Sequence, residues 1–205
     1  NQIPGVYILS GALNTNRITI RGVGARTLYG TDKLRLYYND IPITNGSGFS
    51  SIEAYDIENL SQIEVVKGPK AISYGTNLGG AIILNSKEAL GESNSFNNNF
   101  TVGSYNLLKN NFSFSHADEK SLGLNYEHLK TDGYRENNNF QRDGVLINSF
   151  YKINSKNKIG LLVNYIDYKA QIPSSLGITD FNENPQKAAF TWKEAQGFEA
   201  NKYTL

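Results

Sequence analysis

Apolar and polar residues alternate along the second half of the chain in segments of about ten residues, a spacing typical of strands that cross a membrane. The alternation is clearest at residues 122–127, 145–151 and 159–165. A period of two places one set of side chains on an apolar face and the other on a mixed, polar face. We therefore expect six strands, at residues 96–104, 107–116, 121–130, 144–153, 158–169 and 198–205.

The connections between these strands alternate in length. Those at 117–120 and 154–157 are tight, whereas those at 131–142 and 170–197 are long. Transmembrane β-barrels have short turns on the periplasmic side and longer loops outside. A soluble β-sandwich would also show short strands separated by turns, but the alternating loop lengths favour the barrel.

The first ninety residues have a different pattern, with short strands separated by glycine-rich loops. Residues 17–22 alternate between apolar and polar, and residues 34–38 form a second apolar segment. Asn39-Asp40 follows as a turn, since Asn and Asp tolerate the left-handed backbone that glycine usually supplies. A short helix is expected at residues 51–59, directly before the most distinctive part of the chain.

That distinctive part is residues 57–87, which have an unusual order of parts. A β-branched strand is stopped by Gly-Pro, because proline cannot donate to a ladder, and one or two helical turns and a glycine pair precede a second strand. The parts lie at residues 63–67, 68–69, 70–75, 79–80 and 81–85. Composition alone would allow this stretch to be an αβ element of a soluble domain.

The composition narrows the possible functions. Lys and Arg number 20 against 19 Asp and Glu, so the net charge of +1 gives no strong field for binding nucleic acid. The absence of Cys and the presence of only two His argue against a thiolate or histidine metal site. The 13 Tyr, 10 Phe and 19 Gly suit a β-rich protein with aromatic girdles. No apolar run reaches the roughly 18 residues of a membrane-spanning helix.

Neither a nucleotide site nor a catalytic site is indicated. Gly22-Val23-Gly24 could begin a phosphate-binding loop, but Thr27 stands where the dinucleotide motif needs a third glycine, and no helix follows. Neither His116 nor His128 lies in a recognisable nucleophile motif. We expect no enzyme activity, no cofactor and no resident metal.

The order of residues in 57–87 resembles the plug domain of TonB-dependent outer-membrane receptors. The matching positions are Ile57, Glu58, Ile63, Glu64, Val65, Lys67, Gly68, Pro69, Tyr74, Gly75, Gly79, Gly80, Ile82, Leu84, Ser86 and Lys87. Two earlier segments, Ile20-Arg21-Gly22 and residues 35–42, also resemble this family. Asn39-Asp40 is a departure, because the family more often has Asp-Gly there.

The resemblance implies a mixed α/β plug domain at residues 1–90, followed by antiparallel transmembrane β-barrel strands at 91–205. Family barrels have about 22 strands, so six strands are an incomplete barrel. The implied location is the bacterial outer membrane, with outer-membrane lipid around the strands. We expect the TonB-binding box to precede Asn1 and the remaining strands to follow Leu205.

The implied function is import of a scarce ligand, driven by TonB of the inner-membrane energy-coupling complex. The Gly-Ala-Arg segment at 24–26 and residues 172–176 resemble receptors for ferric siderophores or ferric citrate, so the cargo would be a small Fe(III) chelate. Glycan importers typically have Lys-Asp-Ala where this chain has Lys67-Gly68-Pro69, which argues against an oligosaccharide. Cobalamin, haem, copper and oligosaccharide remain alternatives within the fold, and a passive porin or an adhesin barrel, both without a plug, is the alternative outside it.

The resemblance also implies two groups of site residues in the plug. The loops at 11–16, 25–32 and 45–50 would form the floor of the ligand pocket, where loops on a rigid scaffold carry function. Arg26 suits an anionic group because of its planar fork. The other ligand-binding candidates are Asn14, Asn16 and Asn45 for hydrogen bonds and Tyr29 and Phe49 for aromatic contact. Each could instead be an ordinary solvated loop residue.

The second group, Arg21 and Lys67, would lock the plug against barrel carboxylates, as basic residues at these motif positions do in the family. The family more often has Arg where this chain has Lys67, so bidentate pairing is lost at that position.

Overall fold

The computed structural model describes residues 3–10, 16–24, 33–44, 48, 52, 55–68, 71–75, 78–87, 93–118, 120–196 and 198–204. The chain forms two compact units, residues 1–87 and residues 88–205.

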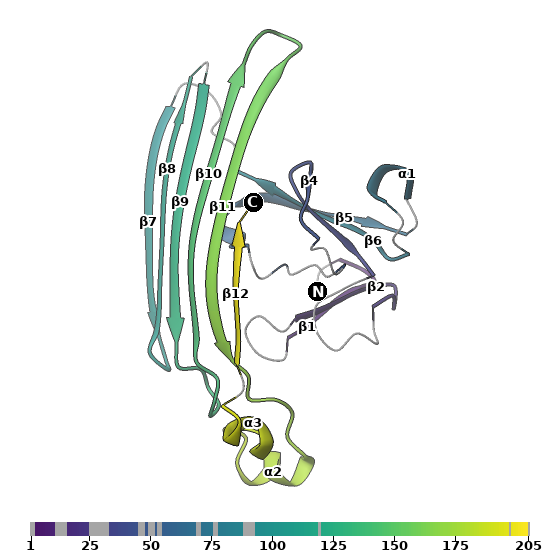
Figure 1. The fold of residues 1–205 in the computed structure, drawn as a ribbon, viewed down its shortest axis with the longest axis vertical. Coiled ribbons are helices and arrows are strands. Elements are labelled where there is room, and N and C mark those ends of the chain that lie inside the picture. The colour runs from purple at the N-terminus through teal and green to yellow at the C-terminus, as the bar shows by residue number, and fades with distance from the viewer. Residues whose placement is uncertain are drawn as a thin grey trace. The chain divides into compact units, whose positions relative to one another are not determined.

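The first unit is built on a mixed four-stranded sheet with the strand order β4-β3-β6-β5 (Figure 1). Strand β3 pairs with β6 in parallel, while β5 runs antiparallel to β6 and β4 antiparallel to β3. A separate antiparallel pair, β1 with β2, precedes this sheet. The elements are β1 (Val6–Ser10), β2 (Asn16–Ile20), β3 (Arg35–Tyr38), β4 (Ile41–Pro42), the 3₁₀ turn η2 (Ile57–Asn59), β5 (Leu60–Lys67), α1 (Ala71–Tyr74) and β6 (Gly80–Ser86).

Strand β6 is the core of the first unit because it is paired on both edges. Four consecutive residues from Ala81 to Leu84 are buried, which is the continuous apolar run expected of a strand covered on both faces. Val66 and Ile83 pack in one cluster with Tyr37 and Tyr74, whose rings meet edge to face at 5.6 Å.

The predicted order of strand, bend, helical turn and strand in residues 57–87 is confirmed, with β5 beginning three residues earlier than expected. Gly75, directly after α1, has φ +80°, as expected of the glycine that ends a helix. The turn after β3 is also confirmed, and Asn39 has φ +51°. Its side-chain oxygen accepts from the Ser86 amide at 2.9 Å, so asparagine adds a link to β6 that glycine could not make.

The helix expected at residues 51–59 is confirmed only in part. Of the described residues of that segment, Ile52 and Ile57–Asn59 are 3₁₀-helical, whereas Tyr55 and Asp56 are not, so the described residues form no continuous helix. The Asp56 side chain accepts from the Glu58 amide at 3.0 Å and caps the turn Ile57–Asn59. Strand β5 begins at Leu60, so the β-branched residues that follow take extended structure instead of prolonging the turn.

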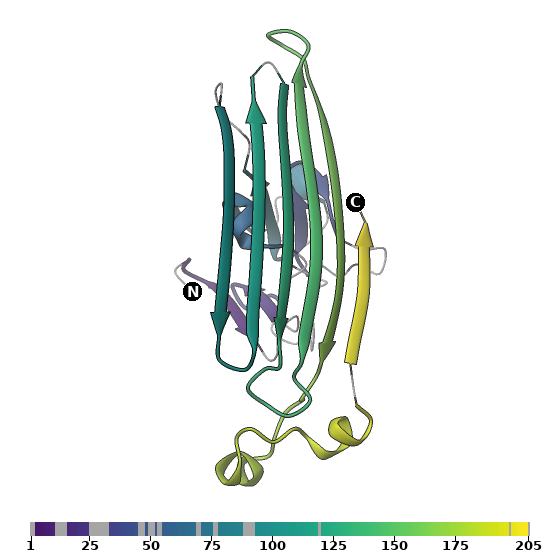
Figure 2. The ribbon, with the colours of Figure 1, turned by 90° about the vertical axis from the view of Figure 1, so that its left-hand side faces the viewer.

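The second unit is one six-stranded antiparallel sheet in which every strand pairs with its sequence neighbours, in the order β12-β11-β10-β9-β8-β7 (Figures 1 and 2). Its elements are β7 (Ser93–Gly103), β8 (Leu107–Ala117), β9 (Lys120–Thr131), β10 (Phe140–Lys152), β11 (Lys158–Gln171), α2 (Ile178–Glu183), α3 (Phe190–Glu194) and β12 (Phe198–Thr204). The predicted fold class, a mixed α/β plug followed by antiparallel barrel strands, is confirmed.

All six predicted strands are present, but β10 begins at Phe140 and not at residue 144. Residues 140–143 pair with both β9 and β11, so the expected loop 131–142 shrinks to 132–139. The polar sequence Gln141-Arg142-Asp143 concealed this end of the strand. The second long loop, residues 172–197, contains helices α2 and α3, which the sequence pattern did not predict.

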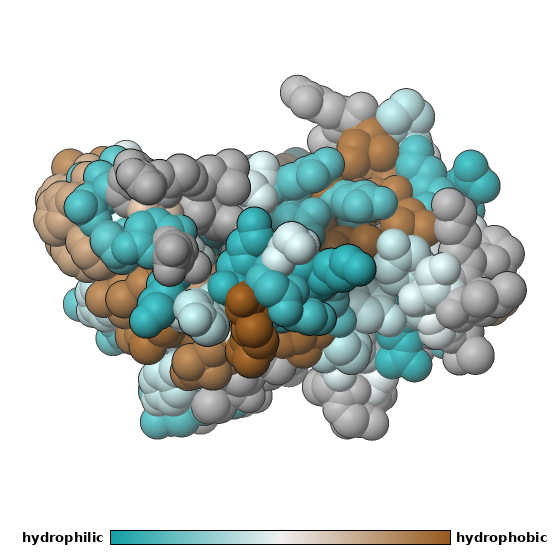
Figure 3. Space-filling model, turned by 90° about the horizontal axis from the view of Figure 1, so that it is seen from above, coloured by the Kyte–Doolittle hydropathy of each residue, from teal (hydrophilic) through white to brown (hydrophobic). Residues whose placement is uncertain are grey.

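The two faces of this sheet differ as the alternation predicted. The exposed face is apolar, and Figure 3 shows hydrophobic residues along the left margin of the view, where β7 to β9 lie. This face includes Phe96, Phe100, Val102, Leu108, Leu122, Tyr126, Ile159, Leu161, Val163 and Tyr165. On the opposite face, small residues stand beside large ones: a Cβ on Gly123 would lie 2.0 Å from Asn148 Oδ1, and one on Gly144 2.8 Å from Glu127 Cγ.

Replacing Gly80 by alanine should destabilise the first unit by at least about 3 kcal/mol. Gly80 has φ +115°, and a Cβ there would lie 2.0 Å from the Val66 carbonyl oxygen. Hydrogen exchange of residues 80–86 in the intact protein measures the effect. Gly68→Ala is the matched control, since φ is +88° but nothing lies within 4 Å of the added Cβ, so its cost is about 1–2 kcal/mol. Equal exchange in the two variants would contradict this packing.

Candidate functional site

Most of the predicted ligand-binding residues lie outside the described residues: Asn14, Arg26, Tyr29, Asn45 and Phe49. Asn16 is the first residue of β2, and only its backbone is described. Their roles therefore stay predictions.

The two predicted locking residues, Arg21 and Lys67, meet at one place within the first unit. Lys67 Nζ donates to the Pro4 carbonyl at 2.7 Å, and the Arg21 amide donates to the Gly5 carbonyl at 2.7 Å. Arg21 has φ +52°, which an ordinary residue rarely adopts. The Pro4-Gly5 turn is thus held from β5 and from the end of β2, a contact that the locking hypothesis did not foresee.

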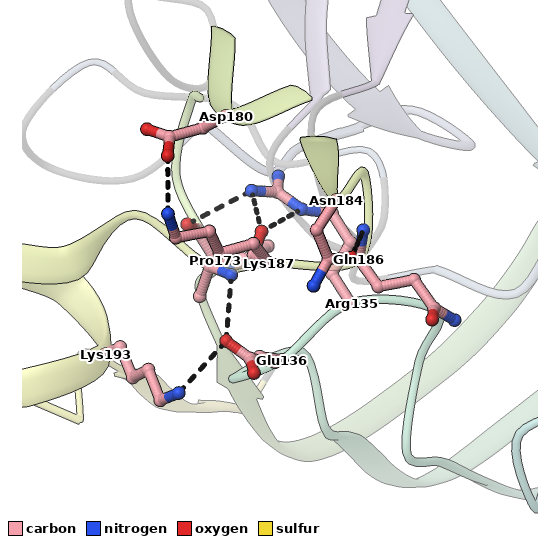
Figure 4. Close-up of polar contacts among 9 residues, drawn as sticks. Arg135, Glu136, Pro173, Asp180, Asn184, Gln186, Lys187 and Lys193 are labelled. Atoms are coloured by element: carbon pink, nitrogen blue, oxygen red, sulfur yellow. Dashed lines mark hydrogen bonds and ion pairs between the residues drawn. The ribbon is translucent and has the colours of Figure 1, made fainter. Parts of the chain in front are cut away.

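The best-defined polar site in the described residues joins the two long loops at one end of the strand sheet. The loops are 132–139, between β9 and β10, and 172–197, which carries α2 and α3. The two loops first contact each other where β10 begins and β11 ends, because the Gln171 amide donates to the Asn139 carbonyl at 2.8 Å. Further along, the Glu136 amide donates to the Gln186 carbonyl at 2.8 Å. We call this paired structure the loop platform (Figure 4).

Arg135 is the centre of the loop platform. Its Nε and Nη2 donate to the Lys187 carbonyl at 3.1 and 2.8 Å, and Nη1 donates to the Ser174 carbonyl at 2.7 Å. One planar guanidinium therefore holds two separate stretches of the loop 172–197 (Figure 4). Partial burial lowers the pKa of Arg135, because desolvation disfavours the charged form, and the carbonyl oxygens compensate that charge.

Charged side chains surround this centre. Glu136 Oε2 accepts from the Ala188 amide at 3.3 Å and from Lys193 Nζ at 3.2 Å. These hydrogen bonds, that from Ala188 above all, lower the pKa of Glu136. Lys187 donates to Asp180, and this hydrogen bond raises the pKa of Lys187. Both groups therefore stay charged across neutral pH.

The loop platform also presents apolar side chains to solvent. Ile178 and Phe190 are 75% and 73% exposed, and Phe181 is 55% exposed. Exposed large apolar groups beside charged ones are typical of a binding surface. The described residues contain no group of three or more His, Asp or Glu that could hold a metal ion. The loop platform thus presents charged and apolar side chains to solvent next to one another.

Sequence reasoning missed Arg135 and Glu136. Both residues lie in a polar loop. The acceptors of Arg135 are the carbonyl oxygens of Ser174 and Lys187, which are 39 and 52 residues away in the sequence. The only sequence signal was the segment 172–176, whose Pro173 and Ser174 supply carbonyls to Arg135.

Comparison with known families gives the first part of the identification. Residues 1–82 match the family model of the TonB-dependent receptor plug domain.

Solved structures with the same fold include three outer-membrane transporters. The unliganded ferric citrate transporter FecA matches with a TM-score of 0.74 and 21% identity, over 92% of this chain and 31% of that chain. The ferric yersiniabactin uptake receptor FyuA from Yersinia pestis matches with a TM-score of 0.70 and 16% identity, over 87% and 30%. The copper transporter OprC matches with a TM-score of 0.68 and 15% identity, over 82% and 27%. The chain thus spans less than a third of each of these proteins.

The plug match and the fold together define the class. Residues 1–82 match the plug domain of the TonB-dependent receptors, and the chain as a whole has the fold of the corresponding part of the outer-membrane transporters named above. In the residues that the structure describes, no helix is long and apolar enough to cross a membrane.

Arg135→Lys should loosen the loop platform, because an ammonium cannot reproduce the fork that holds the Ser174 and Lys187 carbonyls together. We expect the free energy of local opening to fall by about 2 kcal/mol, roughly a 30-fold rise in opening. Hydrogen exchange of residues 172–190 in the full-length receptor measures this. Lys193→Gln, which removes only an exposed partner of Glu136, is the control and should change exchange far less. Unchanged exchange in Arg135→Lys would show that the fork does not hold the loops.

Acidification should release Glu136 from Ala188 and Lys193. A carboxylate whose folded-state pKa is lowered stabilises the folded state above its unfolded pKa, and this stabilisation is lost as the pH falls through the folded pKa. Exchange protection of Ala188 should therefore be constant across neutral pH and fall below the ordinary pKa range of glutamate. Glu136→Gln should remove this pH dependence. The same pH dependence in the variant would assign it to another group.

Proposed function

We propose that the full-length receptor imports a scarce ligand across the outer membrane and that the inner-membrane protein TonB drives this import. The observation that carries the proposal is the plug domain in one chain with strands whose apolar face suits lipid. A passive porin or an adhesin barrel has no need of a plug, so the plug favours gated, energy-coupled transport over both.

The cargo that we propose is an Fe(III) chelate, such as a ferric siderophore or ferric citrate. The Gly-Ala-Arg segment at 24–26 and the residues 172–176 support this class of cargo. The fold shared with the ferric citrate transporter and with the ferric yersiniabactin receptor is consistent with it. Copper is the second candidate, because the copper transporter OprC has the same fold.

We assign the ligand contacts to two regions. In the plug, Arg26 would contact the anionic groups of the chelate, with Asn14, Asn16, Tyr29, Asn45 and Phe49 around it. In the strand unit, the loop platform would meet the ligand first, since long loops of outer-membrane barrels lie outside. Its exposed Ile178, Phe181 and Phe190 suit the organic part of a chelator. Arg21 and Lys67 would hold the plug against barrel carboxylates.

Expression of the full-length receptor in a host that lacks its own ferric-chelate receptors should restore uptake of radiolabelled iron presented as a chelate. Ferric citrate and a ferric siderophore are tested separately, with copper(II) as the comparison. We expect uptake of at least one ferric chelate, and its loss in an otherwise identical host without TonB, because the plug closes the barrel unless TonB acts on it.

Each of the other outcomes would contradict a different part of the proposal. Iron uptake that persists without TonB would indicate a passive channel. Copper uptake without iron uptake would keep the receptor and replace its cargo. No uptake of either metal by a receptor that inserts normally in the membrane would contradict the iron cargo.

A further inference from the structure

The connection between β10 and β11 carries three lysines and no acidic residue. The sequence from residue 152 to residue 158 is Lys-Ile-Asn-Ser-Lys-Asn-Lys, and all seven residues are exposed. We call these residues the lysine turn. In the sequence, the acidic residues Asp118 and Glu119 belong to the other tight connection, between β8 and β9. The lysine turn therefore places three positive charges together at one end of the sheet.

The lysine turn extends beyond the neighbouring strands. It lies at the top of the views in Figures 1 and 2, past the ends of β8 and β9. The pairing of β10 with β9 stops at Tyr151, whose partner is Lys120. Beyond Tyr151, β10 pairs with β11 alone among the described residues. Side chains in the turn are thus open to other molecules.

Asn154 fixes the shape of the lysine turn. Its side-chain oxygen accepts from the Lys156 amide at 2.9 Å, from the Asn157 amide at 2.9 Å and from the Asn157 side chain at 3.2 Å. The Ile153 amide donates to the Asn157 carbonyl at 3.0 Å. The backbone that carries the lysines is therefore held by hydrogen bonds, as in other turns built on an asparagine side chain.

Two of the lysines face each other across the strand pair. Lys152 and Lys158 are directly opposite in the register, so their Cβ atoms are about 5 Å apart. Like charges at such positions destabilise a sheet. Lys158 Nζ lies 3.7 Å from the centre of the Phe150 ring, and Gly160 leaves space for this ring, since a Cβ there would lie 2.9 Å from Phe150 Cε1. An anion next to the two ammonium groups would offset their repulsion.

The opposed lysines belong to the face of the sheet that would line the barrel lumen. Lys152 shares a face with Asn148, four residues back on β10, which is buried on the side opposite the apolar face. Lys120 belongs to the apolar face, where its Nζ lies 5.4 Å from the centre of the Tyr151 ring. Tight turns lie at the periplasmic end of outer-membrane barrels. The lysine turn therefore stands where the lumen would open to the periplasm.

Lys152 and Lys156 can donate to one bound anion. In the part of the chain that the structure describes, neither side chain makes a hydrogen bond or an ion pair. Each ammonium group has three donors on a flexible four-carbon stem, so the two can converge from the two sides of the turn. Lys158 adds its positive charge beside them, and the site does not require its hydrogen bonds.

We propose that the lysine turn is an exit site for the imported ligand, in which Lys152 and Lys156 bind carboxylates of an anionic Fe(III) chelate that leaves the lumen. This inference rests on the proposed import of an Fe(III) chelate and adds a contact region at the end of the strands remote from the loop platform. Positive charge at the mouth of a channel raises the local concentration of an anion. A chelate with several carboxylates fits best, because the two ammonium groups can contact different ones.

A fluorophore on Ser155→Cys reports on this site directly, because Fe(III) quenches fluorescence at short range. The 205 residues contain no cysteine, so this region gives no background labelling. The labelled full-length receptor in detergent is titrated with ferric citrate. We expect saturable quenching, and binding at least about tenfold weaker in Lys152→Gln/Lys156→Gln. Lys152→Arg/Lys156→Arg should keep the affinity. The control Lys120→Gln removes a lysine at the same end but on the apolar face and should behave as wild type.

Quenching that does not saturate would overturn the proposal, and so would equal affinity in the wild-type receptor and the glutamine variant. Displacement of ferric citrate by an equal concentration of inorganic phosphate would make the turn a general anion site and would also contradict a chelate site.

The role in transport is tested in the uptake experiment described above. The glutamine variant should lower the maximal rate of iron uptake about threefold, because less chelate gathers at the exit, and should leave chelate binding at the cell surface unchanged. An unchanged uptake rate would overturn the exit role. Absence of iron uptake in the wild-type receptor would instead contradict the proposed function, and the quenching titration would still decide whether the turn binds the chelate.

Discussion

The unbroken pairing of the long strands is the constraint on which the second half of this protein depends. Backbone groups in a membrane have no water to bond, so each strand must pair along its whole length. Strand β10 does so with β11 from Phe140 to Lys152, and with β9 from Phe140 to Tyr151. That pairing also fixes which side chains face lipid. A slip of one residue would turn the ion pair of Arg142 and Glu127, 2.9 Å apart on the inner face, towards the bilayer.

The same register builds the loops at the end of the sheet. The pairing of β10 with β11 extends to Phe140 and Ala170. The loop that enters β10 and the loop that leaves β11 therefore start side by side. The side chains of Arg135 and Glu136 are therefore close enough to hydrogen-bond with the backbone of Ser174 and Ala188 in the second loop. The platform that would meet a ligand is thus a consequence of strand pairing, fixed by hydrogen bonds to backbone atoms. Side chains of the second loop remain exposed for contact with other molecules.

Much of this fold could be predicted from the sequence, because the period of two is a property of individual strands. The bend at Gly68, the glycine after α1 and the left-handed Asn39 were also predictable, because each position needs a backbone conformation that glycine or asparagine adopts readily. The start of β10 was missed because its residues are polar and the strand continues beyond the apolar band. Helices α2 and α3 were missed because they are short and because the residues at their N-cap positions, Gly177 and Ala189, make no side-chain cap hydrogen bond.

The site was less predictable than the fold for a physical reason. Arg135 donates to backbone carbonyl oxygens, which every residue has. Its partners therefore cannot be predicted from residue types in the sequence. The ligand contacts of Arg26 and its neighbouring loops rest on the resemblance to the receptor family and stay predictions. Lys67 was predicted as a lock, and its contact with the Pro4 carbonyl adds a structural role inside the plug.

The central claim is that the alternating strands face lipid with one set of side chains, and quenching by brominated lipid tests it most directly. The 205 residues contain no cysteine, so single cysteines can be labelled with a fluorophore against no background from this region. Leu146 and Ile147 are both apolar neighbours on β10, but Leu146 is buried on the inner face and Ile147 lies in the outer row with Leu124 and Val163. In the full-length receptor in vesicles, a label at Ile147→Cys should be strongly quenched and one at Leu146→Cys should not. Equal quenching at both positions, or stronger quenching at Leu146→Cys, would contradict the account.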